Sequence, residues 1–184
     1  MVPSKKGLSF VAVRDYVLDR SGRAHWAAAV ARLPKEDGEI IEGVVGVGWY
    51  PLDLFARVLR AVDREIGTGD LSTIAPMGRF EAERDVPTIH RVLLKMVRPA
   101  FIVEKMAELW PRYNSTGRLV VRRLGAKAVD VTLDDWSDDE ALCASIQGYS
   151  ERALQLAGAR QLRLAQTACK ARGAPACVFH AAWE

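Results

Sequence analysis

The sequence predicts an α+β fold, in which an N-terminal helical layer packs on a small antiparallel sheet of about four strands. Hydrophobic residues recur at helical spacing through residues 1–112, whereas they alternate in much of residues 113–184. The β-like segments form two pairs separated by one long helical segment. Because short turns join antiparallel strands, each pair is predicted to be a hairpin. With 184 residues, the chain is predicted to form a single domain over residues 1–184.

The region before residue 44 is predicted to be mainly helical. Residues 7–22 begin with an apolar run that fits helical spacing, although its β-branched residues also permit a strand. The alanine-rich residues 24–34 are predicted to form a helix that stops near Pro34. Residues 35–43, KEDGEIIEG, are predicted to be a polar connector.

Residues 49–67, WYPLDLFARVLRAVDREIG, have the clearest helical pattern in the chain. Pro51 suits the first helical turn, and Gly67 or Gly69 is predicted to end the helix. One face follows the i, i+3, i+4, i+7 spacing of an amphipathic helix and consists of Leu52, Phe55, Ala56, Leu59, Val62 and Ile66.

Three more helices are predicted before the sheet. A short one lies within residues 70–80, a second begins at residue 86, and a third follows Pro99 over residues 100–110. Their apolar positions are predicted to point inward and include Ile89, Leu93, Met96, Ile102, Met106 and Leu109.

The C-terminal part, residues 113–184, is predicted to be a hairpin, a long helix and a second hairpin. Residues 117–125 and 127–133 form the first pair of strands, and alternation in the second strand predicts one buried and one solvated face. Residues 137–158 form the long helix. The last pair of strands surrounds the turn composition RGAP, at residues 172–175.

Bulk composition excludes several classes of protein. The net charge of +3 is small and both signs are spread along the chain, so no nucleic-acid partner is expected. No apolar run approaches the roughly 20 residues that cross a bilayer, and the N-terminus lacks the pattern of a signal peptide. A cytoplasmic location with reduced thiols is therefore expected for the three cysteines.

No catalytic motif is present, and the chain is predicted not to be an enzyme. The sequence contains no phosphate-binding P-loop, no GxSxG and no HExxH. The acids near residue 138 are explained by helix capping, with Ser137 and Glu140 as a capping box. The histidines lie in separate predicted elements, which disfavours a hydrolytic triad: His25, His90 and His180.

Cys169 and Cys177 flank the last turn and are predicted to lie opposite each other in the hairpin. They are weak candidates for metal ligands, because His180 is three residues past Cys177 and points to the other face of the strand. Cys143, on the long helix, could reach the sheet. The favoured interpretation is two small buried hydrophobic residues, with no metal bound.

Two further segments carry candidate chemistry. His90 is either a ligand of a haem iron or a histidine at a helix edge. In YNSTGR, residues 113–118, Ser115 and Arg118 could bind a carboxylate or phosphate, or could simply form a turn with an exposed arginine.

Three motifs carry a resemblance to known proteins: GWYPLDLFARVLRA, YNSTGRL, and the terminal pattern of two cysteines, a phenylalanine and a tryptophan. They resemble an uncharacterised paralogous family found mainly in myxobacteria. That family is similar to the 4-vinyl reductase-type domains, to haem NO-binding domains and to Bet3-like subunits of the TRAPP vesicle-tethering complex. The resemblance implies helices against an antiparallel sheet with a cavity between them, and a regulatory rather than catalytic role.

The haem-binding relatives imply specific residues. His90 falls where their proximal histidine lies, and Tyr113, Ser115 and Arg118 are similar to their Tyr-x-Ser-x-Arg clamp for the haem propionates. Arg118 stands one position later than in that clamp, and Gly117 takes its place. The vinyl-reductase-type relatives imply a ligand or metal role for the cysteines near the last hairpin.

The expected function is that of a sensory or regulatory domain that binds a small, largely apolar ligand and no obligatory cofactor. The predicted pocket lies between helices and sheet and is lined by Phe55, Leu59, Leu93, Met106, Val121 and Val131. One alternative is a haem-binding gas sensor that uses His90. Another is a protein-interaction or homodimerisation module without a ligand, with Trp26 and Trp110 on its surface.

Overall fold

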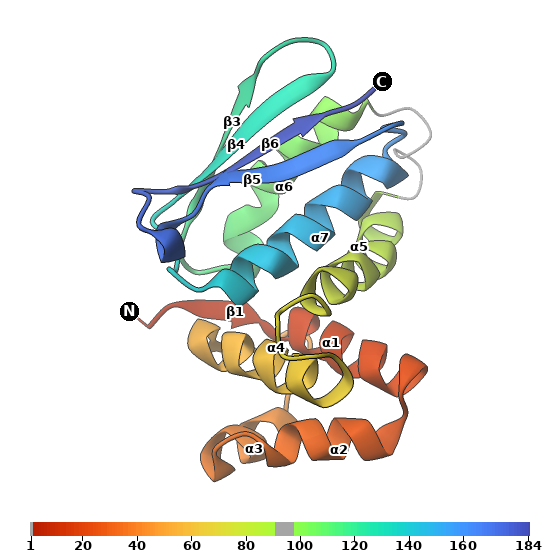
Figure 1. Ribbon diagram of the computed structural model, residues 1–184, viewed down its shortest axis with the longest axis vertical. Helices are drawn as coiled ribbons and strands as arrows, with labels where there is room; N and C mark the ends of the chain where they lie inside the picture. Colours follow the sequence, from red (N-terminus) through yellow and green to blue (C-terminus); the bar gives the residue numbers. More distant parts are fainter. Residues whose placement is uncertain (1, 91–97) are drawn as a thin grey trace.

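The computed structural model confirms the α+β fold class (Figure 1). The structure describes residues 2–90 and 98–184, without the side chains of residues 87–90. In the described residues, four N-terminal helices occupy one end of the molecule, a four-stranded sheet occupies the other, and three further helices lie between them. The fold thus has the predicted helical layer, and its sheet has the predicted number of strands.

The N-terminal end contains more regular structure than the sequence predicts. Its elements are β1 (Ser4–Lys6), α1 (Gly7–Arg20), α2 (Arg23–Ala31), α3 (Lys35–Glu42), β2 (Trp49–Pro51) and α4 (Leu52–Ile66). The predicted connector is helix α3, because Glu36 and Asp37 stabilise its first turn and Arg57 pairs with Asp37 at 2.6 Å. Strands β1 and β2 form an antiparallel pair that was not predicted, since three-residue strands leave no periodicity.

The central helices are α5 (Ile74–His90), α6 (Pro99–Tyr113) and α7 (Glu140–Leu156). The predicted break near residue 86 is wrong, because α5 is one helix through that point. The predicted capping box is also wrong: the cap of α7 is Asp139, whose side chain accepts a hydrogen bond from the backbone N–H of Ala141 at 2.8 Å. Asp139 also pairs with Arg60 on α4 at 2.7 Å, which ties the start of α7 to the N-terminal end.

The sheet consists of β3 (Arg118–Arg123), β4 (Ala128–Asp134), β5 (Arg163–Ala168) and β6 (Cys177–Ala182) in the order β3-β4-β6-β5, all antiparallel. A short 3-10 helix, η1 (Lys170–Arg172), lies between β5 and β6. Helix α6 packs on β3 and α7 packs on β5, so both cover the sheet on one side (Figure 1). The buried side chains alternate along the two central strands: Val129, Leu133, Cys177, Phe179 and Ala181.

Helices α5 and α7 lie in backbone contact, side by side in Figure 1. A Cβ atom at Gly78 would lie 2.2 Å from the carbonyl oxygen of Ser145, and one at Gly148 would lie 2.0 Å from that of Ala75. Only glycine fits at either position, because a backbone atom cannot rotate away from the overlap. These two glycines therefore set the distance between the helices.

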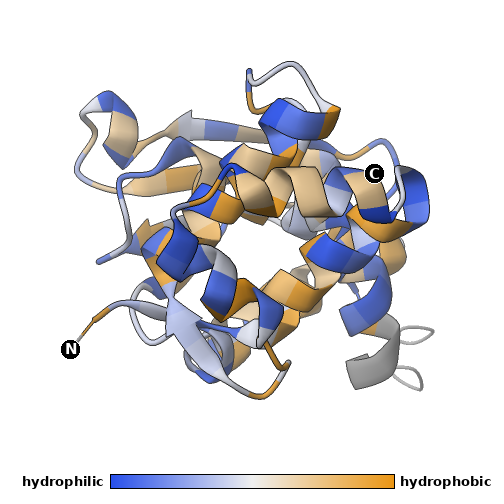
Figure 2. Cartoon of the chain, turned by 90° about the horizontal axis from the view of Figure 1, so that it is seen from below, coloured by the Kyte–Doolittle hydropathy of each residue, from blue (hydrophilic) through white to orange (hydrophobic). Residues whose placement is uncertain are grey.

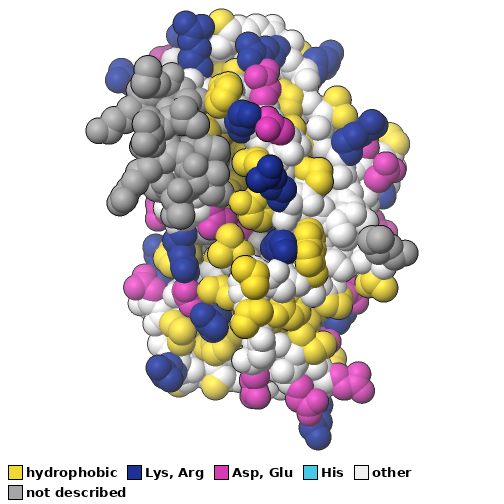
Figure 3. Space-filling model, turned by 180° about the vertical axis from the view of Figure 1, so that it is seen from behind, with side chains coloured by type: hydrophobic (Ala, Val, Ile, Leu, Met, Phe, Trp, Pro, Cys, Tyr) yellow, Lys and Arg dark blue, Asp and Glu magenta, His cyan; other side chains and the backbone are white. Residues whose placement is uncertain are grey.

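Hydrophobic and hydrophilic residues alternate along the helices, as amphipathic helices require (Figure 2). On the face seen in Figure 3, hydrophobic side chains are interspersed with charged side chains of both signs. Trp110, predicted to lie on the surface, is only 9% exposed and its indole N–H donates to the Thr116 carbonyl at 2.9 Å. Within the described part of the chain, no helix is long and apolar enough to cross a membrane.

Candidate functional site

A cavity of about 100 Å³ lies between β1, the start of α1 and the helices α5, α6 and α7. Its apolar wall is formed by Val86, Ile102, Met106, Leu109, Trp110 and Ile146. Its polar wall is formed by Lys5, Ser9, Glu81, Asp85, Lys105, Tyr113, Asn114, Ser145, Tyr149 and Ser150. The cavity therefore combines an apolar surface with ionisable groups, which is the composition of a small-molecule site.

Two carboxyl groups project from α5 one helical turn apart. Glu81 is only 7% exposed, and its Oε1 accepts a hydrogen bond from the Ser9 hydroxyl at 2.5 Å. Burial, and next the negative charge of Glu81, raise the pKa of Asp85 to about 7. Among the described residues Asp85 has no hydrogen-bond or ion-pair partner. One of the two acids thus accepts a hydrogen bond, and the other lines the cavity and has no hydrogen-bond partner in the part of the chain that the structure describes.

Lys5 reaches the same cavity from β1. Its amine donates to Oδ1 of Asn114 at 3.3 Å and lies 5.3 Å from the centre of the Phe55 ring. Burial lowers the pKa of Lys5, and the carboxylates of Glu81 and Asp85 oppose that change. In the described structure Lys5 forms an ion pair with neither acid. The amine and the two carboxyl groups therefore share the cavity and influence each other's pKa, without a direct ion pair among the described residues.

Two tyrosines complete the polar wall. Burial raises the pKa of Tyr113, and the charge of Asp85 raises it further. Burial and then the charges of Asp85 and Glu81 raise the pKa of Tyr149. Both hydroxyls therefore stay protonated at neutral pH and are hydrogen-bond donors to whatever occupies the cavity.

The structure separates the residues of the predicted apolar pocket. Met106 lines the cavity, whereas Phe55 and Leu59 belong to the large buried cluster around α1 and α4. Val121 and Val131 pack on a different cluster, between the sheet and the ends of α6 and α7. Leu93 lies outside the described residues.

Of the predicted haem residues whose side chains the structure describes, only Tyr113 lines the cavity. Tyr113 lines it, but the Ser115 hydroxyl accepts a hydrogen bond from the backbone N–H of Ser4 at 2.7 Å. Arg118 lies at the exposed start of β3 and pairs with Asp134 at 3.3 Å. His90 is the last residue of α5, and its side chain lies outside the described part of the structure.

Among the described residues, two of the three clamp residues, Ser115 and Arg118, are engaged away from the cavity. The cavity is well below the roughly 300 to 1,000 Å³ of pockets for organic ligands of larger size. Gly117 has a φ of +81°, and a Cβ there would lie 2.7 Å from the Trp136 ring, so an arginine cannot occupy this position. Of the three clamp residues, only Tyr113 is placed to contact a ligand.

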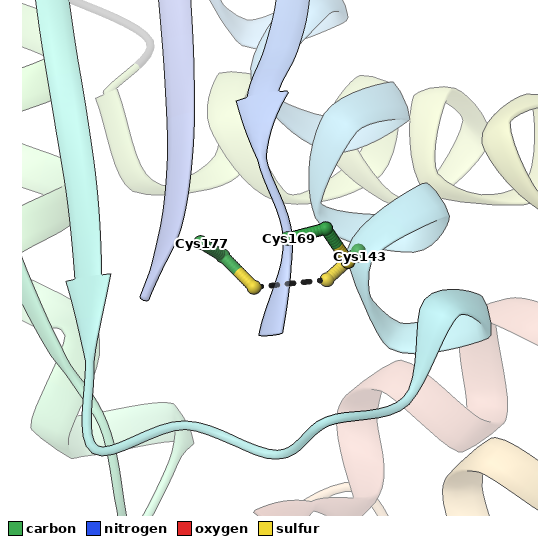
Figure 4. A group of neighbouring side chains, drawn as sticks. All are labelled: Cys143, Cys169 and Cys177. Atoms are coloured by element: carbon green, nitrogen blue, oxygen red, sulfur yellow. Dashed lines mark hydrogen bonds between the residues drawn. The ribbon is translucent and has the colours of Figure 1, made fainter. Parts of the chain in front are cut away.

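A second site consists of three cysteines that come from separate elements (Figure 4). Cys143 lies on α7, Cys169 follows β5, and Cys177 begins β6. Their sulfur atoms all lie within 4.8 Å of one another, and the Sγ atoms of Cys143 and Cys177 are 3.4 Å apart. We refer to these three residues as the cysteine cluster. Sequence reasoning paired only Cys169 with Cys177, because nothing in the spacing places the long helix against the last hairpin.

The cysteine cluster is buried and its thiols are free. Burial, and next the neighbouring Cys177, raise the pKa of Cys143. Thiolates bound to one zinc ion at about 2.3 Å are separated by less than 5 Å, so three such sulfurs suit a soft metal. His180 lies on the opposite face of β6, where its Nδ1 is 2.8 Å from Oδ1 of Asp130. The imidazole is thus engaged elsewhere.

Comparisons with known proteins identify the fold. No protein-family model matches the chain, and no curated protein matches it significantly. An H-NOX protein from S. oneidensis in the Fe(II)NO ligation state is 16% identical, with a TM-score of 0.75, covering 97% of this chain and 99% of that one. The unliganded Fe(II) H-NOX protein from K. algicida is 13% identical, with a TM-score of 0.69 and coverages of 97% and 96%.

A solution structure of the IWP-051-bound H-NOX from Shewanella woodyi is also similar, at 11% identity and a TM-score of 0.69, covering 97% of this chain and 94% of that one. The similarity therefore extends over nearly the whole chain and shows that this protein has the H-NOX fold. This finding agrees with the haem NO-binding part of the predicted resemblance. The myxobacterial, vinyl-reductase-type and TRAPP parts of that resemblance stay predictions.

Proposed function

We propose that this chain is a non-catalytic sensory domain that binds a small molecule in the cavity between β1, α5, α6 and α7. The observation that carries the proposal is the set of charged groups in the cavity, Lys5, Glu81 and Asp85, of which Asp85 has no partner among the described residues. Buried ionisable groups destabilise a fold unless they are paired, so their presence favours a role in binding. The charged lining favours a polar ligand over the apolar one predicted from the sequence.

The arrangement of the helices offers a way to transmit binding. The two acids lie on α5, Tyr149 lies on α7, and both helices meet at Gly78 and Gly148. A ligand that contacts both helices favours one relative position of α5 and α7 over others. Because α7 packs on β5, a change in its position is passed to the sheet, where a partner protein or a second copy can read it.

The test is native mass spectrometry of the purified protein, combined with a variant that fills the cavity. Ser150→Phe places a ring in the cavity, whereas Gln147→Phe on the same helix lies outside the lining and is the matched control. We expect a small molecule of defined mass to be bound by the wild type and by Gln147→Phe, and lost in Ser150→Phe. Equal occupancy in all three proteins would contradict the proposed site.

A haem-binding gas sensor is the second candidate, and the H-NOX fold favours it. His90 follows Val86, a lining residue, by one helical turn on α5, which would place the candidate ligand near the cavity. Haem supplies an iron that binds diatomic gases. The protein expressed with a haem precursor would show a Soret band that His90→Ala abolishes. A colourless wild-type protein under those conditions rules this candidate out.

The cysteine cluster favours a separate structural role, as a zinc site that ties α7 to the last hairpin. The support is that three buried sulfurs lie within 4.8 Å of one another, one from α7 and two from the last hairpin. A fourth ligand would be a water or another exogenous group, since no imidazole or carboxylate joins the three sulfurs in the described structure. Elemental analysis should give one zinc per chain, and Cys143→Ala should lose it.

A further inference from the structure

We propose that the cavity recognises a small zwitterion, a short amino acid whose ammonium group pairs with Glu81 and Asp85 and whose carboxylate pairs with Lys5. The proposal rests on the sensory function proposed above and names its ligand class. It starts from one juxtaposition: the amine lies on the wall formed by β1, the two acids lie on the wall formed by α5, and no ion pair joins them.

Charge complementarity selects a ligand with both signs. A simple cation would pair with Asp85 but would be repelled by Lys5. A simple anion would pair with Lys5 but would be repelled by Asp85. A ligand carrying one charge of each sign neutralises both walls at once. The electrostatic gain is increased by the apolar side chains of Val86, Ile102 and Met106, which line the same cavity as the charged groups.

The size of the cavity limits the ligand to a few heavy atoms. An engineered cavity of about 150 Å³ accommodates benzene, which has six heavy atoms, so about 100 Å³ suits roughly four heavy atoms. Glycine is the amino acid nearest to this size, alanine and β-alanine are one atom larger, and a nucleotide or a lipid is far too large. Ser145 and Ser150 offer neutral hydrogen bonds along the wall formed by α7.

The other ionisable groups that line the cavity do not change this assignment. Lys105 on α6 already forms an ion pair with Glu108. Tyr113 on α6 and Tyr149 on α7 are uncharged at neutral pH because their pKa values are raised. The charged groups left for a ligand are Lys5, Glu81 and Asp85.

Binding of the ammonium group should depend on pH in a definite direction. The carboxyl of Asp85, with a pKa of about 7, must be ionised to pair with an ammonium. Its ionised fraction rises about tenfold between pH 6 and pH 8, so the affinity for the zwitterion should rise by up to about tenfold over the same range. In Asp85→Asn this dependence should be absent.

The experiment is isothermal titration calorimetry of the whole chain with glycine, alanine and β-alanine, compared with the half-ligands acetate and methylammonium. We expect at least one amino acid to bind at least tenfold more tightly than either half-ligand. Lys5→Met should abolish the preference over methylammonium, and Asp85→Asn should abolish the preference over acetate. Lys6→Met, on the same strand as Lys5 but outside the lining, is the matched control and should keep both preferences.

Amino acids that bind no more tightly than the half-ligands would overturn the zwitterion proposal. If native mass spectrometry then still finds another molecule that Ser150→Phe excludes, the sensory function stands and only the ligand class is wrong. If no molecule is found and no probe binds, both fail. Circular dichroism checks the fold of Lys5→Met. If that variant does not fold, Lys5→Arg replaces it in the test: it keeps the charge and should retain part of the preference for an amino acid over methylammonium.

Discussion

The cavity and the cysteine cluster are both interior sites assembled from distant parts of the chain, but they differ in charge and in packing. The cavity holds an amine and two carboxyl groups around about 100 Å³ of space. The cysteine cluster is buried, its sulfurs all lie within 4.8 Å of one another, and those of Cys143 and Cys177 are 3.4 Å apart. Both include residues of α7, so the same helix contributes to an open, charged site and to a closed, thiol-lined one.

The difference shows how the chemistry of a side chain decides what its burial requires. A thiol is uncharged below its pKa, and burial raises the pKa of Cys143, so the cluster can be dry without a partner. A carboxylate or an ammonium cannot be dry without a large penalty. The cavity beside Asp85 and Lys5 is therefore best understood as space for a ligand or water. The cysteine cluster is stable as packed thiols and can also bind a metal ion.

The strongest way to break both sites together is to separate α5 from α7. Gly148→Ala places a Cβ 2.0 Å from the Ala75 carbonyl oxygen, and backbone atoms must move to relieve the overlap. We expect a loss of about 3 kcal/mol or more in the free energy of unfolding, measured by urea denaturation. Gly125→Ala has open space around it and is the control, with an expected change below about 0.5 kcal/mol. Equal stabilities of the two variants would contradict the close helix contact.

Metal removal should affect the cysteine cluster and leave the cavity intact. If zinc is bound at 100 times its Kd, it contributes about 2.7 kcal/mol, which corresponds to about 5–10 °C in the unfolding midpoint. A chelator should therefore lower the midpoint of the zinc-loaded wild type by this amount. Cys177→Ala should be insensitive to the chelator. An unchanged midpoint of the zinc-loaded wild type would favour the interpretation of the cysteines as buried hydrophobic residues.

A change at Asp85 should affect the cavity and leave the cysteine cluster intact. Because its pKa is raised to about 7 in the folded chain, the protonated form is favoured by folding, and this contribution is lost as the pH rises toward 7 and above. Asp85→Asn should therefore be more stable than wild type at pH 8 by up to about 4 kcal/mol, and nearly equal to it at pH 4. Thermal unfolding at the two pH values measures the difference, and a gain of the same size at both would show that Asp85 does not titrate in this range.

The smallest effect is expected at His180, on the face of β6 that points away from the cysteine cluster. Its ion pair with Asp130 is partly exposed, so His180→Ala should change stability by less than about 1 kcal/mol. Zinc content, measured by elemental analysis, should be the same as in wild type. Loss of zinc in this variant would indicate that the imidazole is a metal ligand, and would contradict the placement of His180 and the cysteine cluster on opposite faces of β6.

The fold class could be predicted because it follows from local patterns. The helical spacing from Leu52 to Ile66 matches α4, and the alternation in residues 127–133 matches β4. Helix α3 was missed because its composition is polar, and β1 was missed because three residues show no period. The break predicted at residue 86 failed because α5 continues past it, held against α7 by a contact that no local pattern records.

The candidate sites could be predicted only in part. The cysteines of the last hairpin were recognised, but Cys143 joins them through helix packing. Met106 and Tyr113 line the cavity as expected of a site residue, whereas Lys5, Glu81 and Asp85 gave no signal, since single charged residues in amphipathic segments are common. Arg118 was interpreted as a possible clamp residue, and the pairing of β3 with β4 places it beside Asp134 instead.

By itself the sequence determined the kinds of element, their order and the predominance of antiparallel pairing, because these depend on periodicity and turn chemistry within a few residues of each position. Only the tertiary structure decided which side chains meet. Lys5 reaches Asn114 and shares a cavity with Asp85, and three sulfurs converge from a helix and a hairpin. Such contacts depend on how helices cross and how strands align over long distances in the chain, and residue spacing carries no record of either.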